Sequence, residues 1–212
     1  MSKANAVAVN PSTSELAAPA KPQLHVDSFC IFGLRPRFQL DKAHLTERYH
    51  QLMQAVHPDR YSNASEADRR YAMQWARRVN EAYRELLNPL KRARLLCELA
   101  DSPVDVLDTS LPPAFLVQQM QWREDFESIS QSSDKIPIGQ REQRLNQIEA
   151  TIKQAAKQLA EAFSQSALGQ GRTPCTDDLK SAAALIRQWM FLEKFIDDIE
   201  QQRMQWLEVQ PS

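Results

Sequence analysis

Residues 41–60, DKAHLTERYHQLMQAVHPDR, hold the clearest helix start and stop signals in this sequence. Asp41 is a good N-cap residue, because its short carboxylate can accept a hydrogen bond from the first helical turn. The helix is predicted to end at His57-Pro58, since a residue before proline is pushed out of the α region. Between these signals, apolar residues recur at helical spacing: Leu45, Tyr49, Leu52 and Val56. The stretch therefore predicts an amphipathic helix over residues 42–56 that leads into a His-Pro-Asp tripeptide.

A longer helix is predicted after the polar loop of residues 59–65. It has acids in its first turn at Glu66 and Asp68 and ends at Asn88-Pro89. Its apolar stripe is Tyr71, Trp75, Val79, Ala82 and Leu86. Two amphipathic helices with facing stripes pack antiparallel, so the tripeptide loop is expected to lie exposed at one end of the pair.

Two short helices are predicted on either side of this pair. Residues 27–34 form a short apolar segment that glycine stops at position 33, and residues 90–99 follow the Asn-Pro break. Residues 1–24, rich in Ala, Ser, Pro and Val, predict a disordered tail.

The second half of the chain predicts a three-helix bundle. Residues 101–113, DSPVDVLDTSLPP, have the composition of a linker. Helical patterns then cover residues 114–130, 138–166 and 177–206, with Pro137, Gly139, Gly169, Gly171 and Pro174 in the predicted breaks. The expected core stripe of the last helix is Ala182, Leu185, Trp189, Leu192, Ile196 and Ile199. Three helices with short connections favour an antiparallel bundle, so the predicted class is all-α.

Composition excludes several classes of function. The chain has 4 glycines against 12 prolines, and no glycine lies in a phosphate-binding loop or a dinucleotide fingerprint. Its 3 cysteines form no CxxC pair and predict reduced thiols in the cytoplasm, with no metal site and no cofactor. No apolar stretch is long enough to span a membrane. An enzyme would require a nucleophile with a neighbouring base, and the sequence shows no such combination.

Charge divides the chain in two. Residues 35–94 carry 13 Lys and Arg against 7 Asp and Glu, a balance of +6, and residues 95–212 carry 11 against 18, a balance of −7. This asymmetry indicates two modules with different partners or two ordinary solvated surfaces.

The first bundle helix has apolar residues on more than one face. With Phe115 at zero on a helical wheel, Trp122, Phe126 and Ile129 fall within about 40° of it and complete a core stripe. A second set lies at about 100–200° on the same wheel: Leu116, Val117, Met120 and Glu124. This second set indicates a surface for another partner, or packing against the front module or a bundle neighbour.

The front half resembles the J-domain family. The resemblance rests on His57-Pro58-Asp59, on Tyr49 eight residues before it, and on Asn80-Glu81-Ala82-Tyr83 in the second helix of the pair. In that family the tripeptide contacts a DnaK-type chaperone and stimulates its ATPase. The resemblance implies the following chaperone-binding residues: His57, Pro58, Asp59, Arg60, Arg48 and Tyr49. His50 and Gln51 stand where general J-domains carry basic residues, which predicts a specialised chaperone partner.

The chain from residue 27 to about 206 resembles the HscB family of co-chaperones in iron–sulfur cluster assembly. The matching motifs are Phe32-Gly33-Leu34, Asn88-Pro89-Leu90 with Arg92-Ala93, Ala114-Phe115-Leu116 with Arg123-Glu124, and Phe191-Leu192 with Lys194. The resemblance implies a J-domain (25–100) joined by a linker (101–113) to a three-helix bundle (114–208) in an L shape. The zinc-binding cysteine pairs of some eukaryotic members are absent, which indicates a bacterial-type protein.

The resemblance also implies the partners. The bundle of HscB proteins binds an IscU-type scaffold and delivers it to HscA, a dedicated DnaK-type ATPase. The corresponding scaffold-binding positions are Leu116, Val117, Met120, Gln121, Glu124, Ser128 and Phe191; Gln121 and Ser128 replace acids of better-known members. The leading hypothesis is thus a cytoplasmic, non-enzymatic adaptor that binds neither nucleic acid nor membrane. The alternatives are a general J-domain co-chaperone for unfolded clients and a helical nucleic-acid-binding protein that uses the basic stretch 60–94.

Overall fold

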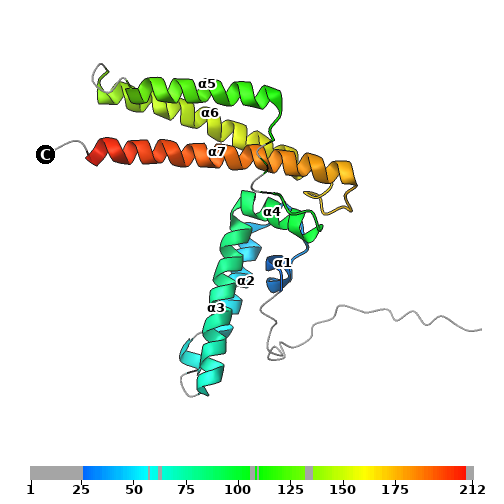
Figure 1. Ribbon diagram of the computed structural model, residues 1–212. Coiled ribbons are helices and arrows are strands. Elements are labelled where there is room, and N and C mark those ends of the chain that lie inside the picture. Colours follow the sequence, from blue (N-terminus) through cyan, green and yellow to red (C-terminus); the bar gives the residue numbers. More distant parts are fainter. Residues whose placement is uncertain are drawn as a thin grey trace, which may run out of the picture.

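The computed structural model describes residues 26–208, except 57, 62–63, 106–107, 109 and 132–135. Within these residues it contains seven α-helices, one 3-10 helix and no strand, so the predicted all-α class is confirmed. Figure 1 shows two groups of helices: an upright pair, α2 and α3, with α1 beside it, and a stack of α5, α6 and α7 that lies crosswise to the pair. Helix α4 lies at the elbow where the two groups meet. The tail predicted over residues 1–24 lies outside the described residues.

The helices of the front group begin at side-chain caps, of which the sequence predicts Asp41. The Asp41 carboxylate accepts hydrogen bonds from the first turn of α2 (Lys42–Ala55), and the Ser65 hydroxyl accepts one from the first turn of α3 (Glu66–Leu87). Asp27 caps the short α1 (Ser28–Ile31). Asn88 ends α3 and, through its side chain, caps α4 (Pro89–Leu99), with proline at the first helical position. The chain therefore turns sharply from α3 into α4 at Asn88.

The front core is formed by the stripes of α2 and α3, with α1 packed against them. Leu45 of α2 is buried, and so are Trp75, Val79, Ala82 and Leu86 of α3, as predicted. Tyr71 is only half-buried, because Ala72 is the residue that faces the core at this turn. Phe29 and Phe32 close the core from the side of α1.

The bundle consists of α5 (Pro113–Gln131), α6 (Ile138–Gln165) and α7 (Thr176–Glu208), each within two residues of its predicted bounds. The predicted stripe of α7 is wrong at two positions. Ile186 and Phe195 are buried, whereas Leu185 and Ile196 are half-buried. The physical reason is that α7 packs on α6 and α4, and the Phe195 ring also meets Phe126 of α5 at 5.6 Å, so its apolar face is wider than one stripe.

Glycine marks two of the chain reversals. Gly33, after α1, and Gly171, between α6 and α7, have φ of +64° and +68°, a region that favours glycine. Gly139, expected in the break before the second bundle helix, is instead the second residue of α6. Pro137 directly precedes that helix. Proline has no backbone N–H, but at a helix start no such donor is needed, and the residues after it continue the helix.

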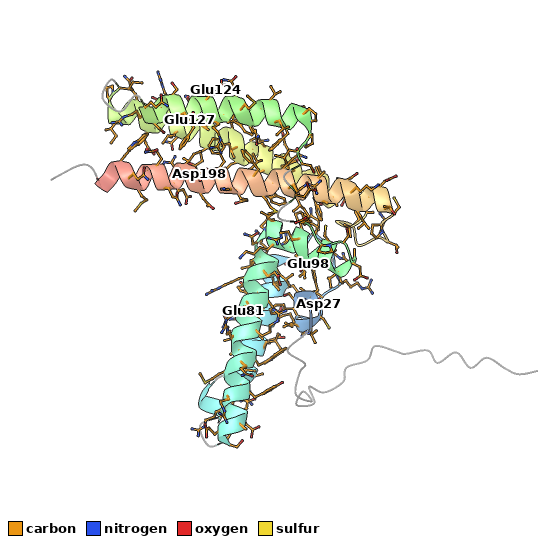
Figure 2. All side chains as sticks on the ribbon, in the orientation of Figure 1. Asp27, Glu81, Glu98, Glu124, Glu127 and Asp198 are labelled. Atoms are coloured by element: carbon orange, nitrogen blue, oxygen red, sulfur yellow. The ribbon has the colours of Figure 1, made fainter. Side chains whose placement is uncertain are left out.

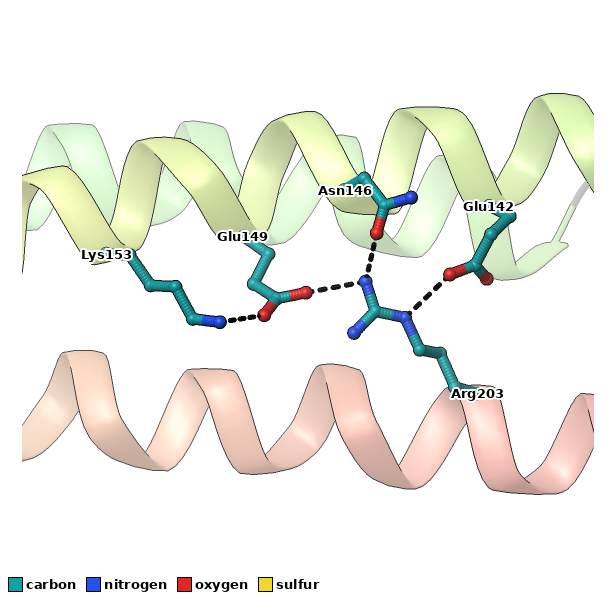
Figure 3. Close-up of polar contacts among 5 residues, drawn as sticks. All are labelled: Glu142, Asn146, Glu149, Lys153 and Arg203. Carbon is teal, nitrogen blue, oxygen red and sulfur yellow. Dashed lines mark hydrogen bonds and ion pairs between the residues drawn. The ribbon is translucent and has the colours of Figure 1, made fainter.

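A polar cluster joins α6 to the C-terminal half of α7 (Figure 3). The Arg203 guanidinium donates to Glu142 at 2.9 Å, to Asn146 at 2.6 Å and to Glu149 at 2.5 Å. Lys153 donates to the same Glu149 carboxylate. The hydrogen bonds from Lys153 and from Arg203 lower the pKa of Glu149, whose side chain is largely buried between the two helices.

The segment between the two groups lies against α7. Val104 is buried, and Leu111 packs on the core. Asp108 pairs with Arg187 of α7 at 3.1 Å, and Arg187 Nε donates to the Ser110 carbonyl at 3.1 Å. The described part of residues 101–113 is therefore held in place on the bundle.

Candidate functional site

The tripeptide loop lies at the end of the α2–α3 pair that points away from the bundle (Figure 1). Helix α2 ends at Ala55, and a short 3-10 helix, η1 (Pro58–Tyr61), follows before α3 begins. His57 lies outside the described residues, and of Pro58 and Asp59 the structure describes only the backbone. Arg60 is exposed, and its guanidinium approaches the Gln54 carbonyl at 3.5 Å.

A small apolar cavity of about 80 Å³ adjoins this loop. It is lined by Val56, Tyr61, Arg69, Ala72 and Met73. Met73, which is 66% exposed, forms its outer edge. The loop end of the front group thus combines a charged arginine with an accessible apolar spot.

Tyr49 lies about two turns from the loop and faces α3. Its hydroxyl donates to Asn80 Oδ1 at 2.8 Å, and its ring stacks on Tyr83 with 4.2 Å between the centroids. Asn80 in turn donates to the Ala76 carbonyl, so both ends of the Asn80–Tyr83 motif hold α2 against α3. The motif that supports the resemblance therefore has a packing role here.

Arg48 is exposed, next to Tyr49 on α2. Its Nε donates to the Phe32 carbonyl at 3.3 Å, directly after α1. A Cβ atom at Gly33 would lie 3.1 Å from the Arg48 guanidinium. The structure thus places Arg48 and Tyr49 on one helix but away from Arg60, which alone among the described side chains of the predicted set lies at the loop.

The second apolar face of α5 is exposed. Leu116, Val117 and Met120 are 37%, 70% and 60% exposed. On the opposite side of the helix, Phe115 is 8% exposed and packs edge-on against Trp122 of the same helix, with 6.3 Å between the ring centroids. Helix α5 therefore buries one apolar stripe and presents another to solvent.

Phe191 occupies a different position from the rest of this predicted set. It is half-buried in α7, and its ring meets Phe115 edge-on at 5.8 Å and Phe195 at 6.1 Å. It therefore joins α7 to α5 beneath the exposed stripe, and substituting it perturbs the bundle core as well as the surface.

Two of the three polar members of the set, Gln121 and Ser128, face another side of α5. Gln121 and Ser128 line a groove of about 500 Å³ between α5 and α6, together with Asp125, Arg144 and others. Glu124 is exposed on α5 (Figure 2). The structure thus places Leu116, Val117, Met120 and Glu124 on an exposed strip of α5, and Gln121 and Ser128 in a groove beside α6.

The sequence indicated Arg92 only as part of a family motif and did not predict that Arg92 and Phe38 join the two groups of helices. Arg92 of α4 is 6% exposed, and its guanidinium lies over the Phe38 ring, 4.9 Å from the centroid. Phe38 packs edge-on against Phe163 at 5.2 Å and Trp189 at 6.3 Å. One sequence signal was available, which is that Arg92 lies in the mostly apolar stretch of residues 92–97. Arginine is rarely fully buried unless it is paired.

The described part of the chain contains no group of three His, Cys, Asp or Glu residues that could hold a metal ion. None of its helices has the length and apolar character needed to cross a bilayer. Burial raises the pKa of the Cys97 thiol to about 11, whereas Cys30 and Cys175 are exposed.

A helical pair with the sequence His-Pro-Asp in its connecting loop, joined to a three-helix bundle, agrees with the co-chaperone architecture that the resemblance implies. Comparison with known proteins identifies the family. Residues 111–200 match the family model of the HSCB C-terminal oligomerisation domain. A co-chaperone protein HscB homologue of Bordetella pertussis is 37% identical over 174 residues, which cover 82% of this chain and 94% of that protein. A homologue of Azoarcus is 35% identical over 179 residues, covering 84% and 93%. The chain belongs to the HscB co-chaperone family, whose members are not enzymes.

Solved structures agree with this assignment. Chaperone HscB from Vibrio cholerae matches with a TM-score of 0.66 and 29% identity, over 85% of this chain and 99% of that one. Human co-chaperone HscB matches with a TM-score of 0.71 over 92% and 94% of the two chains, and at 22% identity it shows the shared fold.

Proposed function

We propose that this protein is an adaptor that binds an IscU-type scaffold through its bundle and delivers it to an HscA-type, DnaK-family chaperone. The front group, residues 25–100, stimulates the chaperone ATPase through His57, Pro58 and Asp59. The observation that carries the proposal is the second apolar face of α5, because Val117 and Met120 remain 70% and 60% exposed although the bundle core is complete without them.

The arrangement of the two surfaces supports simultaneous binding. The tripeptide loop lies at the end of the α2–α3 pair that points away from the bundle, and the exposed strip lies on α5 (Figure 1). Two partners bound there do not compete for one surface. Holding both on a single chain raises the effective concentration of the scaffold at the chaperone, which increases the yield of each encounter.

The first test changes the tripeptide. We expect His57→Gln to leave helicity and scaffold affinity unchanged and to abolish stimulation of the chaperone ATPase, because the tripeptide would lose the group that docks on the chaperone. Steady-state ATP hydrolysis by the chaperone measures this. His44→Gln, exposed in the first turn of α2 and far from the loop, is the matched control and retains stimulation. Normal stimulation by a folded His57→Gln variant would remove the tripeptide from the proposal.

The second test changes the exposed strip without touching the core. We expect Val117→Ala combined with Met120→Ala to weaken scaffold binding by about 2 kcal/mol, roughly thirty-fold, as truncation of apolar anchors does. Isothermal titration with the scaffold measures the affinity. Met204→Ala, at an equally exposed methionine of α7, is the control. Full affinity in the double variant would place the scaffold elsewhere, and tight binding of denatured model substrates would favour a general co-chaperone.

A further inference from the structure

The two groups of helices are joined at an elbow of contacts around Phe38. The Phe38 amide donates to the Gly169 carbonyl at 2.9 Å, and its ring lies between the aromatic rings of Phe163 and Trp189. Beside it, Gln39 Nε2 donates to Ser164 Oγ at 2.8 Å. The segment between α1 and α2 is therefore attached to the turn that follows α6 and to the middle of α7.

Arg92 is the one charged side chain buried at this elbow in the described part of the chain. One guanidinium nitrogen donates to the Leu86 carbonyl, in the last turn of α3. The guanidinium carbon lies over the Phe38 ring, 4.9 Å from its centroid, and Nε has no hydrogen-bond partner among the described atoms. Burial lowers the pKa of this group, and no carboxylate among the described residues pairs with it.

Stability does not explain this arrangement. A buried cation loses its hydration, and a carbonyl and an aromatic face replace only part of it. A well-packed apolar side chain of similar volume is often neutral or stabilising at such a site. The guanidinium instead contributes fixed geometry. Because it is planar and rigid, it holds the Leu86 carbonyl and the Phe38 ring in one position relative to each other.

The two groups that Arg92 connects belong to different arms of the molecule. Leu86 lies in the last turn of α3, and Phe38 packs against Phe163 and Trp189 of the bundle. Helix α3 has 22 residues and spans about 33 Å, with η1 and the tripeptide at its far end. A tilt of about 10° at the elbow therefore moves the tripeptide by about 6 Å.

We propose that Arg92 is a positioning residue that sets the angle between the α2–α3 pair and the bundle, and that this angle couples scaffold binding to ATPase stimulation. The coupling rests on the proposed function. Arg92 touches neither partner; it acts through the direction of α3. A scaffold held on the bundle then meets the chaperone in one orientation relative to the tripeptide, which makes the stimulation greater when the scaffold is bound.

Gly171 provides an independent way to disturb the same elbow. It has φ of +68°, and a Cβ atom there would lie 2.8 Å from the Pro36 carbonyl, two residues before Phe38. Gly171→Ala therefore pushes the turn after α6 away from the segment that holds Phe38. We expect it to change the angle from the bundle side, without altering α4.

The angle is measured without any partner. In a chain with Cys30→Ser and Cys175→Ser, Met73→Cys on α3 and Met204→Cys on α7 place spin labels on exposed positions of the two arms. Cys97 stays in place, since its thiol is buried and has a pKa of about 11. Pulsed electron-spin resonance then gives the distribution of distances between the labels.

We expect a narrow distribution for the labelled parent, and a broadened or shifted one for Arg92→Met and for Gly171→Ala. Arg94→Met, two residues along α4, is the matched control and leaves the distribution unchanged. Arg92→Lys keeps the charge but not the planar fork, and we expect it to broaden the distribution as well. Unchanged distributions in folded Arg92→Met and Gly171→Ala would overturn the proposal; if Arg92→Met fails to fold, Arg92→Lys and Gly171→Ala decide it.

The coupling is measured with the complete partners. In the Arg92→Met chain we expect unchanged scaffold affinity and unchanged stimulation without scaffold, but a loss of about five-fold or more in the extra stimulation that scaffold produces. An unchanged extra stimulation, despite an altered distance distribution, would overturn the coupling. If the parent chain neither binds scaffold nor stimulates the chaperone, the proposed function fails, and the distance measurement still decides whether Arg92 sets the angle.

Discussion

At the scale of single residues, Tyr49 shows how a motif position acquires a structural task. The J-domain resemblance implies that it contacts the chaperone. In the structure its hydroxyl donates a hydrogen bond to Asn80 and its ring stacks on Tyr83, so Tyr49 packs α2 against α3. Spacing along the sequence indicates which face of a helix a tyrosine lies on, but the partner of its hydroxyl depends on the register between two helices. Only the fold reveals that register.

We predict that Tyr49→Phe lowers the free energy of unfolding by about 1 kcal/mol, because it removes one hydrogen bond while the stacked ring remains. Urea unfolding followed by circular dichroism measures the change. Asn80→Ala should produce a loss that does not add to that of Tyr49→Phe, since both variants break the same bond. Additive losses would contradict the paired role, and a loss of ATPase stimulation in folded Tyr49→Phe would show that the hydroxyl also serves the chaperone.

At the scale of helices, local signals predicted most of the fold. Asp41 caps α2 as expected, and α3 ends at the predicted Asn88-Pro89 break, because both signals depend on residues within one turn. The buried face of α7 was predicted less well. It depends on which neighbours surround the helix, and neither the contact with α4 nor the contact with α5 leaves a trace in the periodicity of α7 itself.

The cluster around Arg203 gives a prediction at this scale. Arg203→Gln should lower the free energy of unfolding by about 2 kcal/mol at neutral pH, because Glu149 would lose a charged partner in a largely buried position. Lys157→Gln, in an exposed pair with Glu161, should cost about 0.5 kcal/mol or less. Chemical denaturation of both variants against the parent measures the difference; equal losses would contradict the special role of the cluster.

The same cluster predicts a dependence on pH. The folded chain lowers the pKa of Glu149 relative to the unfolded chain, so its contribution is complete above the usual carboxylate range. The contribution is lost as the pH falls through that range, near about pH 4, toward the lowered folded value. The difference in stability between the parent and Arg203→Gln should therefore shrink on acidification, and a constant difference from pH 7 to 3 would contradict it.

At the scale of the whole molecule, the sequence predicted two candidate surfaces and, by resemblance, an L shape with a linker, but not the side chains that join the two groups of helices. The tripeptide loop and the exposed strip of α5 each follow from one helix and its flanks. The elbow combines Phe38, Arg92, Gly169 and Trp189, which belong to four separate segments. No periodicity relates such residues to one another. The buried side chains nevertheless form one continuous cluster through both groups of helices.

A continuous core predicts that the chain unfolds as one cooperative unit. We expect a single calorimetric transition for the parent, with equal van't Hoff and calorimetric enthalpies. Phe38→Ala removes the ring that links the two groups, a loss of about 3–5 kcal/mol for a buried phenylalanine, and should divide unfolding into two transitions. Phe126→Ala, which removes a ring that packs on Phe195 inside the bundle, should lower the transition temperature and leave a single transition. One transition in a destabilised Phe38→Ala chain would mean that the remaining contacts of α4 with α7 suffice to keep the two arms cooperative.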